Sequence, residues 1–135
     1  MARRLIVDTG VLVASERGRA DLRSALATDD DLVVAAVTVA ELRAGVELGG
    51  EKHRAARSAF VLKVLETLPV LPYDLATAEA HGRLLAHVHR AGSPRGAHDL
   101  IIAATAAASR RTILTTDRSA RFDQLPGVAC LVVEG

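Results

Sequence analysis

The chain has 135 residues, of which 50% are hydrophobic but only 2% aromatic, and its formal net charge is +1. This length suits one domain with a core of its own, so we expect a single domain over residues 1–135. The single cysteine excludes an internal disulfide and any zinc site built from several cysteines. No apolar run is long enough to span a bilayer or to form a secretion signal, so we expect a cytoplasmic protein without a membrane partner.

Short strand-like segments alternate with helix-like segments along the chain. Apolar and β-branched runs predict strands at 5–7, 32–34, 69–72 (limited by a proline at each end), 112–115 and 129–133. The pattern between them predicts helices at 11–16, 20–27, 38 to 45 or 49, 51–68, 75–91 and 100–109, with a short helix or turn at 117–122. This alternation is typical of an α/β fold, in which helices cover both faces of a parallel sheet.

Four acidic residues follow strands or open helices in this pattern. Asp8 and Asp117 come after predicted strands, while Glu41 and Asp99 lie near the starts of predicted helices. Because the carboxyl ends of parallel strands share one edge of a sheet, we expect the four side chains to gather there. Crowded carboxylates raise one another's pKa unless a cation neutralises them, and all-oxygen ligands favour Mg²⁺ or Mn²⁺. The spacing therefore indicates a metal-dependent nuclease or phosphatase.

Each of the four acidic residues also fits an ordinary structural role. Thr38 and Glu41 have the spacing of a capping box, in which the glutamate reaches back to a backbone N–H. Asp99 and Asp117 are typical N-caps of helices, and Asp8 fits a turn. The spacing leaves both roles open for each residue.

Three other classes of α/β protein fit the sequence less well. A haloacid-dehalogenase-type phosphatase requires a second aspartate where this chain has Gly10. A receiver domain requires a late lysine after a strand, and neither Lys52 nor Lys63 is so placed. A dinucleotide-binding module requires a glycine-rich G-x-G-x-x-G turn after the first strand, which is absent here.

The order of four motifs resembles that of a known family. The motifs are Ile6-Val7-Asp8-Thr9, Ala40-Glu41-Leu42, Asp99-Leu100-Ile101-Ile102-Ala103-Ala104-Thr105-Ala106, and Leu114-Thr115-Thr116-Asp117 followed by Phe122. Together they resemble a PIN domain, and more closely the VapC toxins of bacterial type II (VapBC) toxin–antitoxin systems. The likeness runs from residue 5 to about residue 132.

This resemblance implies both a fold and an activity. The implied fold is a PIN-like three-layer α/β/α sandwich with a central, mainly parallel sheet. The implied activity is that of a toxin, an Mg²⁺- or Mn²⁺-dependent endoribonuclease that hydrolyses RNA phosphodiester bonds through metal-activated water. The resemblance also implies a homodimer that is inhibited by a cognate VapB-type antitoxin. The alternative is a PIN-like module that binds RNA or protein without catalysis.

The resemblance further implies which residues act. The catalytic acidic pocket would consist of Asp8, Glu41, Asp99 and Asp117. Asp8 and Asp99 would be the most direct metal ligands, with Glu41 and Asp117 binding a second ion or positioning water. The hydroxyls of Thr9 and Thr115 would orient these carboxylates.

Outside the acidic pocket, two further features invite a functional interpretation. Arg95 and Arg118 lie near Asp99 and Asp117 in the sequence and are placed to bind phosphate at the rim of the pocket, although exposed surface arginines would look the same. The predicted helix 51–68 carries apolar residues that a dimer or an antitoxin would cover, or that belong to the ordinary core.

Overall fold

A five-stranded sheet forms the centre of the computed structural model, which describes residues 2–18 and 26–133. Its strands have the spatial order β3-β2-β1-β4-β5, and every described strand pairing is parallel. The strands are β1 (Arg4–Val7), β2 (Asp31–Ala35), β3 (Val70–Leu71), β4 (Thr112–Thr115) and β5 (Ala129–Val132). The strand that precedes Asp8 is therefore the middle one. Most of the helix predicted at 20–27 falls outside the described residues.

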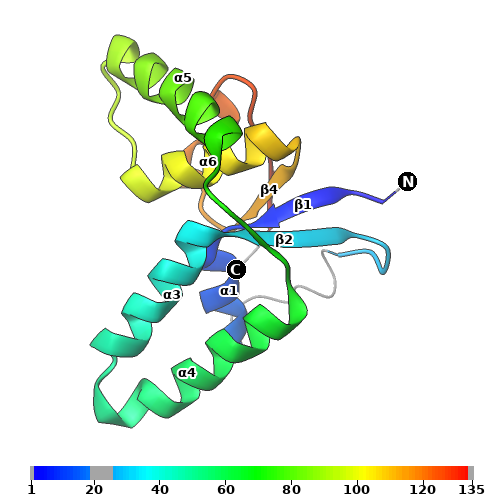
Figure 1. Ribbon diagram of the computed structural model, residues 1–135, viewed down its shortest axis with the longest axis vertical. Coiled ribbons are helices and arrows are strands. Elements are labelled where there is room, and N and C mark those ends of the chain that lie inside the picture. The colour runs from blue at the N-terminus through cyan, green and yellow to red at the C-terminus, as the bar shows by residue number, and fades with distance from the viewer. Residues whose placement is uncertain (1, 19–25, 134–135) are drawn as a thin grey trace.

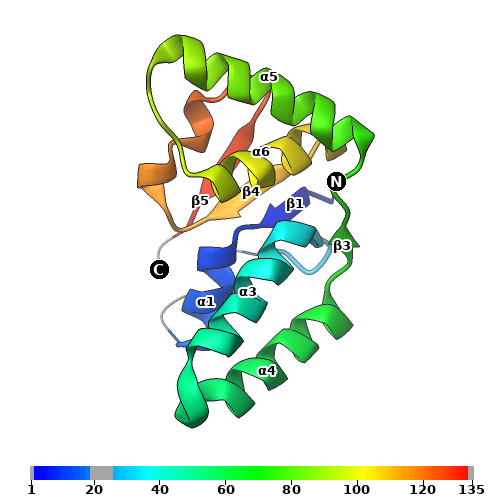
Figure 2. The same ribbon diagram turned by 60° about the vertical axis from the view of Figure 1, so that its left-hand side comes forward.

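Helices cover both faces of this sheet (Figure 1, Figure 2). One face packs against α1 (Thr9–Glu16), α3 (Ala36–Leu48) and α4 (Gly50–Thr67). The other packs against α5 (Leu75–Ala91), α6 (Ala97–Ser109) and the 3₁₀ turns η1 (Arg118–Ala120) and η2 (Phe122–Gln124). The three-layer α/β/α sandwich with a parallel sheet is thus confirmed. None of the described helices is both long and apolar enough to cross a membrane.

The central strands carry uninterrupted apolar runs, residues 5–7 in β1 and 113–114 in β4, because both of their faces are buried there. Successive side chains of a strand point to opposite faces of the sheet. Ile6 and Ile113 pack in the core under α5 and α6, whereas Val7 and Leu114 pack in the core under α1, α3 and α4. All four are at most 2% exposed. A continuous apolar run, rather than an alternating one, is what a doubly covered parallel strand requires.

The helix α5 begins and ends where its sequence predicts. The Asp74 side chain accepts a hydrogen bond of 3.0 Å from the backbone N–H of Thr77, which caps the first turn. Gly92 adopts a left-handed conformation with φ of 63° and ends the helix, as glycine does without steric cost.

The helices α3 and α6 begin two to three residues earlier than the sequence predicts. Their N-cap positions are occupied by Ala35 and Gly96, and neither provides a side-chain cap. Thr38 and Asp99, which look like caps in the sequence, lie inside the first turns instead. The predicted starts were wrong because these helices begin without the polar side chain that usually marks the first turn.

Two neighbouring leucines of α5 test this packing. Leu84 is 2% exposed and lies in the core between α5, α6 and the sheet, whereas Leu85 is 49% exposed. We expect Leu84→Ala to lower the free energy of unfolding by about 2–5 kcal/mol, because it leaves a cavity. The matched Leu85→Ala change should cost less than about 1 kcal/mol. Urea denaturation measures both, and equal losses would contradict the described orientation of α5.

Candidate active site

The four acidic residues named from the sequence come from four separate segments at one end of the sheet. Asp8 follows β1 directly and Asp117 follows β4 after one residue. Glu41 lies in the second turn of α3, the helix that continues from β2, and Asp99 lies in the first turn of α6. Because the strands are parallel, the segments after β1, β2 and β4 leave the sheet at the same edge, and the first turn of α6 brings Asp99 there from the helical layer.

Asp8 is a buried carboxylate at the centre of this edge. It is 6% exposed, and its Oδ2 accepts a hydrogen bond of 2.9 Å from the Thr115 hydroxyl. The pKa of Asp8 is raised to about 6, chiefly by burial and also by the charges of Asp99 and Glu41, although the hydrogen bonds from the Thr115 hydroxyl and the Thr9 backbone lower it. The side chain caps no helix, although Asp8 occupies the N-cap position of α1. A purely structural role as a cap is therefore absent.

Asp99 belongs to the same cluster and lies in the first turn of α6. Its pKa is raised, first by burial and then by the negative charges of Asp117 and Glu41, while His98 and Arg95 act in the opposite direction. The helix begins at Ala97, so Asp99 is not its N-cap. Its carboxylate lies so close to Gly96 that a Cβ there would approach Oδ2 to 2.9 Å. Glycine at this position leaves room for the carboxylate.

Glu41 is held by residues from two other segments rather than by its own helix. Its Oε1 accepts a hydrogen bond of 2.7 Å from the Thr9 hydroxyl, and the Thr9 and Thr38 hydroxyls are 3.1 Å apart. Its Oε2 lies 3.3 Å from His98 Nδ1. The capping box that the sequence offered for Thr38 and Glu41 does not form, because α3 begins at Ala36.

Asp117 is the most exposed of the four and also serves as a helix cap. Its Oδ1 accepts hydrogen bonds from the backbone N–H and the hydroxyl of Ser119, which places Asp117 as the N-cap of η1. Its own backbone N–H donates to the Thr115 hydroxyl at 3.0 Å. Thr115 therefore connects the Asp8 carboxylate to the backbone that carries Asp117.

Each of the four carboxylates lies within electrostatic range of at least one other, but the four do not close around a single point. Asp8 senses the charges of Asp99 and Glu41, and Asp99 senses those of Asp117 and Glu41. Among the described residues, no three His, Cys, Asp or Glu side chains converge closely enough to form a complete metal site. What the cluster offers is an all-oxygen donor set with uncompensated negative charge, the chemistry that suits a hard divalent cation.

The two arginines named from the sequence differ in their surroundings. Arg118 is exposed at the start of η1, beside Asp117. Arg95 is only partly exposed, and its Nη1 donates to the backbone carbonyls of Ala120 and Arg121 at 2.7 and 2.8 Å. These contacts give Arg95 a structural role and leave little of its guanidinium for a phosphate.

His98 is the neighbour of the cluster to which the sequence alone assigns no role. Its side chain is 59% exposed, and it reaches the Glu41 carboxylate from the first turn of α6. The signal in the sequence is its adjacency to Asp99. Its contact partner Glu41, however, is 57 residues away along the chain (positions 41 and 98), and no local sequence pattern predicts such a pairing.

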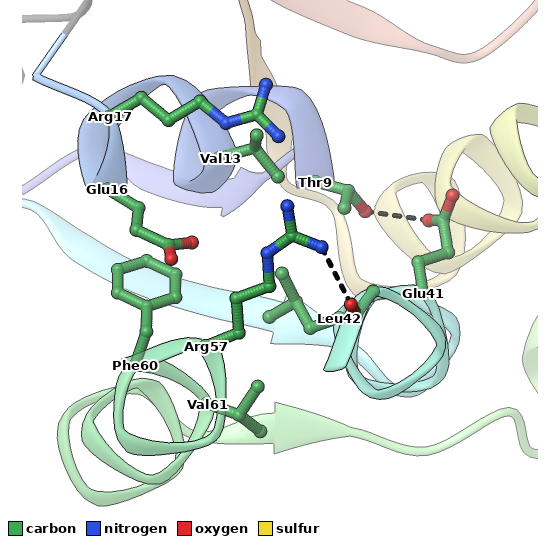
Figure 3. A pocket seen from close by; sticks show the side chains of 10 residues that line it. Thr9, Val13, Glu16, Arg17, Glu41, Leu42, Arg57, Phe60 and Val61 are labelled. Carbon is green, nitrogen blue, oxygen red and sulfur yellow. Dashed lines mark hydrogen bonds between the residues drawn. The ribbon is translucent and has the colours of Figure 1, made fainter. Parts of the chain in front are cut away.

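A hollow beside Glu41 adjoins the acidic cluster. It has a volume of about 90 Å³ and lies between α1, α3 and α4. Figure 3 shows Thr9 and Glu41 at one side of it, Phe60 and Val61 on its apolar wall, and the guanidinium of Arg57 reaching into its middle. Arg57 donates to the carbonyl of Gly45 at 2.9 Å and so fastens α4 to α3. The hollow and the cluster share Glu41 and Thr9, so any group bound in the hollow would lie next to two members of the site.

Comparison with known proteins supports the family resemblance that the order of motifs indicates. The model of the PIN domain matches residues 5–128. Ribonuclease VapC5 of Mycobacterium tuberculosis is 33% identical over 128 residues, which cover 95% of this chain and 92% of that protein. The crystal structure of VapBC-5 from the same species has a TM-score of 0.81 at 32% identity, covering 96% of this chain and 98% of that one.

A second crystal structure extends the agreement in fold. VapBC2 from Rickettsia felis, solved with a DNA fragment from its promoter, has a TM-score of 0.87 at 19% identity and covers 97% of this chain and 99% of that one. At 19% identity, this structural similarity supports the fold alone. The family model and the M. tuberculosis relative both span nearly the whole chain. The chain therefore belongs to the PIN domain family and, within it, to the VapC proteins.

Proposed function

We propose that this protein is the toxin of a type II toxin–antitoxin pair and that it cuts RNA as an endoribonuclease. The observation that carries the proposal is the cluster of Asp8, Glu41, Asp99 and Asp117, gathered from four segments at the carboxyl edge of a PIN-domain sheet. VapC relatives are named as ribonucleases. The full acidic set favours an active enzyme over a PIN-like module that only binds RNA. Because its substrate is cellular RNA, we place its action in the cytoplasm.

A divalent cation, Mg²⁺ or Mn²⁺, fits the donor chemistry of this cluster. The raised pKa values of Asp8 and Asp99 reflect burial and negative charge that the hydrogen bonds to Asp8 and the neighbours His98 and Arg95 of Asp99 offset only in part. We assign Asp8 and Asp99 as the most direct ligands, with Glu41 and Asp117 holding a second ion or positioning water. When bound, such an ion lowers the pKa of a ligated water and stabilises charge on the phosphate oxygens.

The remaining side chains hold these carboxylates in place. The Thr115 hydroxyl donates to Asp8, and the Thr9 hydroxyl donates to Glu41. Each bond fixes one oxygen of its carboxylate and so orients the group. The second oxygen of Glu41 lies 3.3 Å from His98 Nδ1. The all-carboxylate pocket supports hydrolysis by activated water, so the products should carry 5′-phosphate and 3′-hydroxyl ends.

Exposed apolar side chains support protein partners for this chain. Leu48, Leu62 and Leu65 of α3 and α4 are 85%, 51% and 38% exposed. The VapC and FitB structures that resemble this chain were solved as VapBC or FitAB complexes. We therefore propose a cognate VapB-type antitoxin as the inhibitor and a homodimer as the assembled form of the toxin.

Replacing Asp99 with Asn tests the proposed activity. The change removes one proposed metal ligand while preserving the size of the side chain. We expect cleavage to fall by at least about 10- to 100-fold, the loss that follows even when a residue supporting a metal ligand is changed. The measurement is growth after induction of the protein alone, with the ends of cellular RNA sequenced. The native protein should arrest growth and create new site-specific ends, and a chelator should stop cleavage by the purified protein.

The matched control is Asp123→Asn, an identical change at an exposed carboxylate in η2. It should arrest growth as the native protein does. Equal growth of native and Asp99→Asn cultures, with both proteins soluble, would contradict the proposed function. Ends with cyclic phosphate would contradict the route through activated water, because they arise from attack by the RNA 2′-hydroxyl.

The buried charge of Asp8 predicts how the free energy of unfolding depends on pH, measured with a chelator present so that no metal is bound. The pKa of Asp8 is about 6 in the folded protein, against an ordinary value of 3.8. Between these pH values the folded protein binds the proton more tightly than the unfolded chain, so stability falls as pH rises toward and through 6. Asp8→Asn should therefore be more stable than the native protein at pH 7, on the order of 3 kcal/mol, with the gain shrinking toward pH 4.

Asp74→Asn is the control for this measurement, because it should change the free energy of unfolding in the opposite direction. Hydrogen bonds from Thr77 lower the pKa of Asp74, so its charge stabilises the folded protein above its ordinary pKa and this contribution disappears on acidification. The variant should be less stable than the native protein at neutral pH. A stability difference for Asp8→Asn that does not change between pH 4 and 7 would refute the assignment of a buried, uncompensated charge.

A further inference from the structure

Arg95 joins two parts of the chain that each carry a carboxylate of the candidate site. It lies in the loop between α5 and α6, and its Nη1 donates to the carbonyls of Ala120 and Arg121 at 2.7 and 2.8 Å. Its Nη2 lies 3.5 Å from the Gln124 side-chain oxygen. Figure 2 shows the loop between α5 and α6 running alongside the orange segment that contains η1 and η2. The guanidinium thus spans the gap between these two segments.

The segments that Arg95 joins lead directly to Asp99 and Asp117. On one side, Gly96 follows Arg95 and caps α6, and a Cβ at Gly96 would meet the Asp99 carboxylate at 2.9 Å. On the other, η1 begins at Arg118, directly after Asp117, whose side chain caps the turn. A shift of the loop relative to η1 would therefore change the separation of the two carboxylates.

The environment of Arg95 is unusual for an arginine in a surface loop. Its Nε is buried and has no hydrogen-bond acceptor among the described residues. Burying an unsatisfied N–H costs free energy, so this placement persists because the two short bonds at Nη1 hold it. The positive charge also opposes the repulsion that raises the pKa of Asp99. Neither feature is expected of an exposed arginine whose role is to bind a phosphate.

We propose that Arg95 is a positioning residue of the active site: its forked guanidinium ties the start of α6 to the η1 turn and thereby fixes Asp99 relative to Asp117. This inference rests on the proposed function and deepens it. Within the described part of the chain, the partners of the Arg95 guanidinium are Ala120, Arg121 and Gln124 rather than a carboxylate of the site, so Arg95 acts through the backbone that carries two of these carboxylates. A lysine would retain the charge but would lack the rigid, planar guanidinium, whose Nη1 donates to both carbonyls while its Nη2 faces the Gln124 side chain.

The test compares Arg95→Gln and Arg95→Lys with the control Arg83→Gln, an identical loss of charge at an exposed position of α5. Mn²⁺ binding to the purified toxin is measured by calorimetry without RNA, and RNA cleavage is measured separately as kcat and KM. We expect Arg95→Gln to bind Mn²⁺ about 10- to 100-fold more weakly and to lose kcat by a similar factor, with little change in KM. Arg95→Lys should recover part of the loss, and Arg83→Gln should match the native protein.

Three results would overturn the proposal. The first is native-like Mn²⁺ binding by Arg95→Gln, even if its thermal stability falls, since that would leave only a structural role. The second is a raised KM with unchanged Mn²⁺ binding, which would make Arg95 a phosphate ligand. The third is failure of the native protein to bind Mn²⁺. If Arg95→Gln does not fold, native-like Mn²⁺ binding by Arg95→Lys decides against the proposal in the same way.

Failure of the proposed function would look different. A native protein that binds Mn²⁺ but leaves RNA intact would contradict the ribonuclease. In that case weaker Mn²⁺ binding by Arg95→Gln would still support the positioning role, because calorimetry needs no substrate.

Discussion

The buried charge of Asp8 is the constraint on which the rest of the site depends. Asp8 follows the middle strand of the sheet, and its backbone N–H donates to the carbonyl of Leu114 in the neighbouring strand at 2.9 Å. This bond continues the ladder between β1 and β4 past the end of β1 and places the side chain where water is largely excluded. A carboxylate there is costly unless a positive charge meets it. The protein supplies one hydroxyl, from Thr115, and two further negative charges nearby.

The architecture explains why the other carboxylates arrive at the same place. A parallel sheet sends every strand's carboxyl end to one edge, so the segments after β1, β2 and β4 must all pass there. The helix α6 crosses from the other layer and adds Asp99 at its first turn. The two layers of helices thus close around one acidic edge. Under the proposed function, a bound cation would restore the stability that this crowding costs, and the occupancy of the site would then be linked to the stability of the fold.

The sequence predicts the elements that carry their own local signals. The bounds of α5 follow from the cap at Asp74 and the glycine at its end, and the strand β1 follows from its apolar run. The position of Asp8 after that strand needs no further information. The position of Asp117 after β4 is likewise predicted from the sequence, which allows Asp117 to be a helix cap or a site residue. In the structure Asp117 caps η1, and its negative charge also raises the pKa of Asp99, which burial raises most.

What the sequence does not predict are contacts between distant segments. Nothing local to Glu41 reveals that Thr9 and His98 hold it, or that its helix begins at Ala36 without a side-chain cap. The sequence suggests a phosphate ligand at Arg95, because an arginine beside an acidic site looks the same whether it faces solvent or backbone carbonyls. Only the folded arrangement brings the η1 turn against the loop that carries Arg95.

Diffraction from crystals of the toxin grown with Mn²⁺ and recorded at an X-ray energy where manganese scatters anomalously tests the central claim most directly. The account predicts an anomalous peak within ligation distance of the carboxylates of Asp8 and Asp99. Ordered Mn²⁺ elsewhere, with these two carboxylates free of it at saturating concentration, would contradict the account.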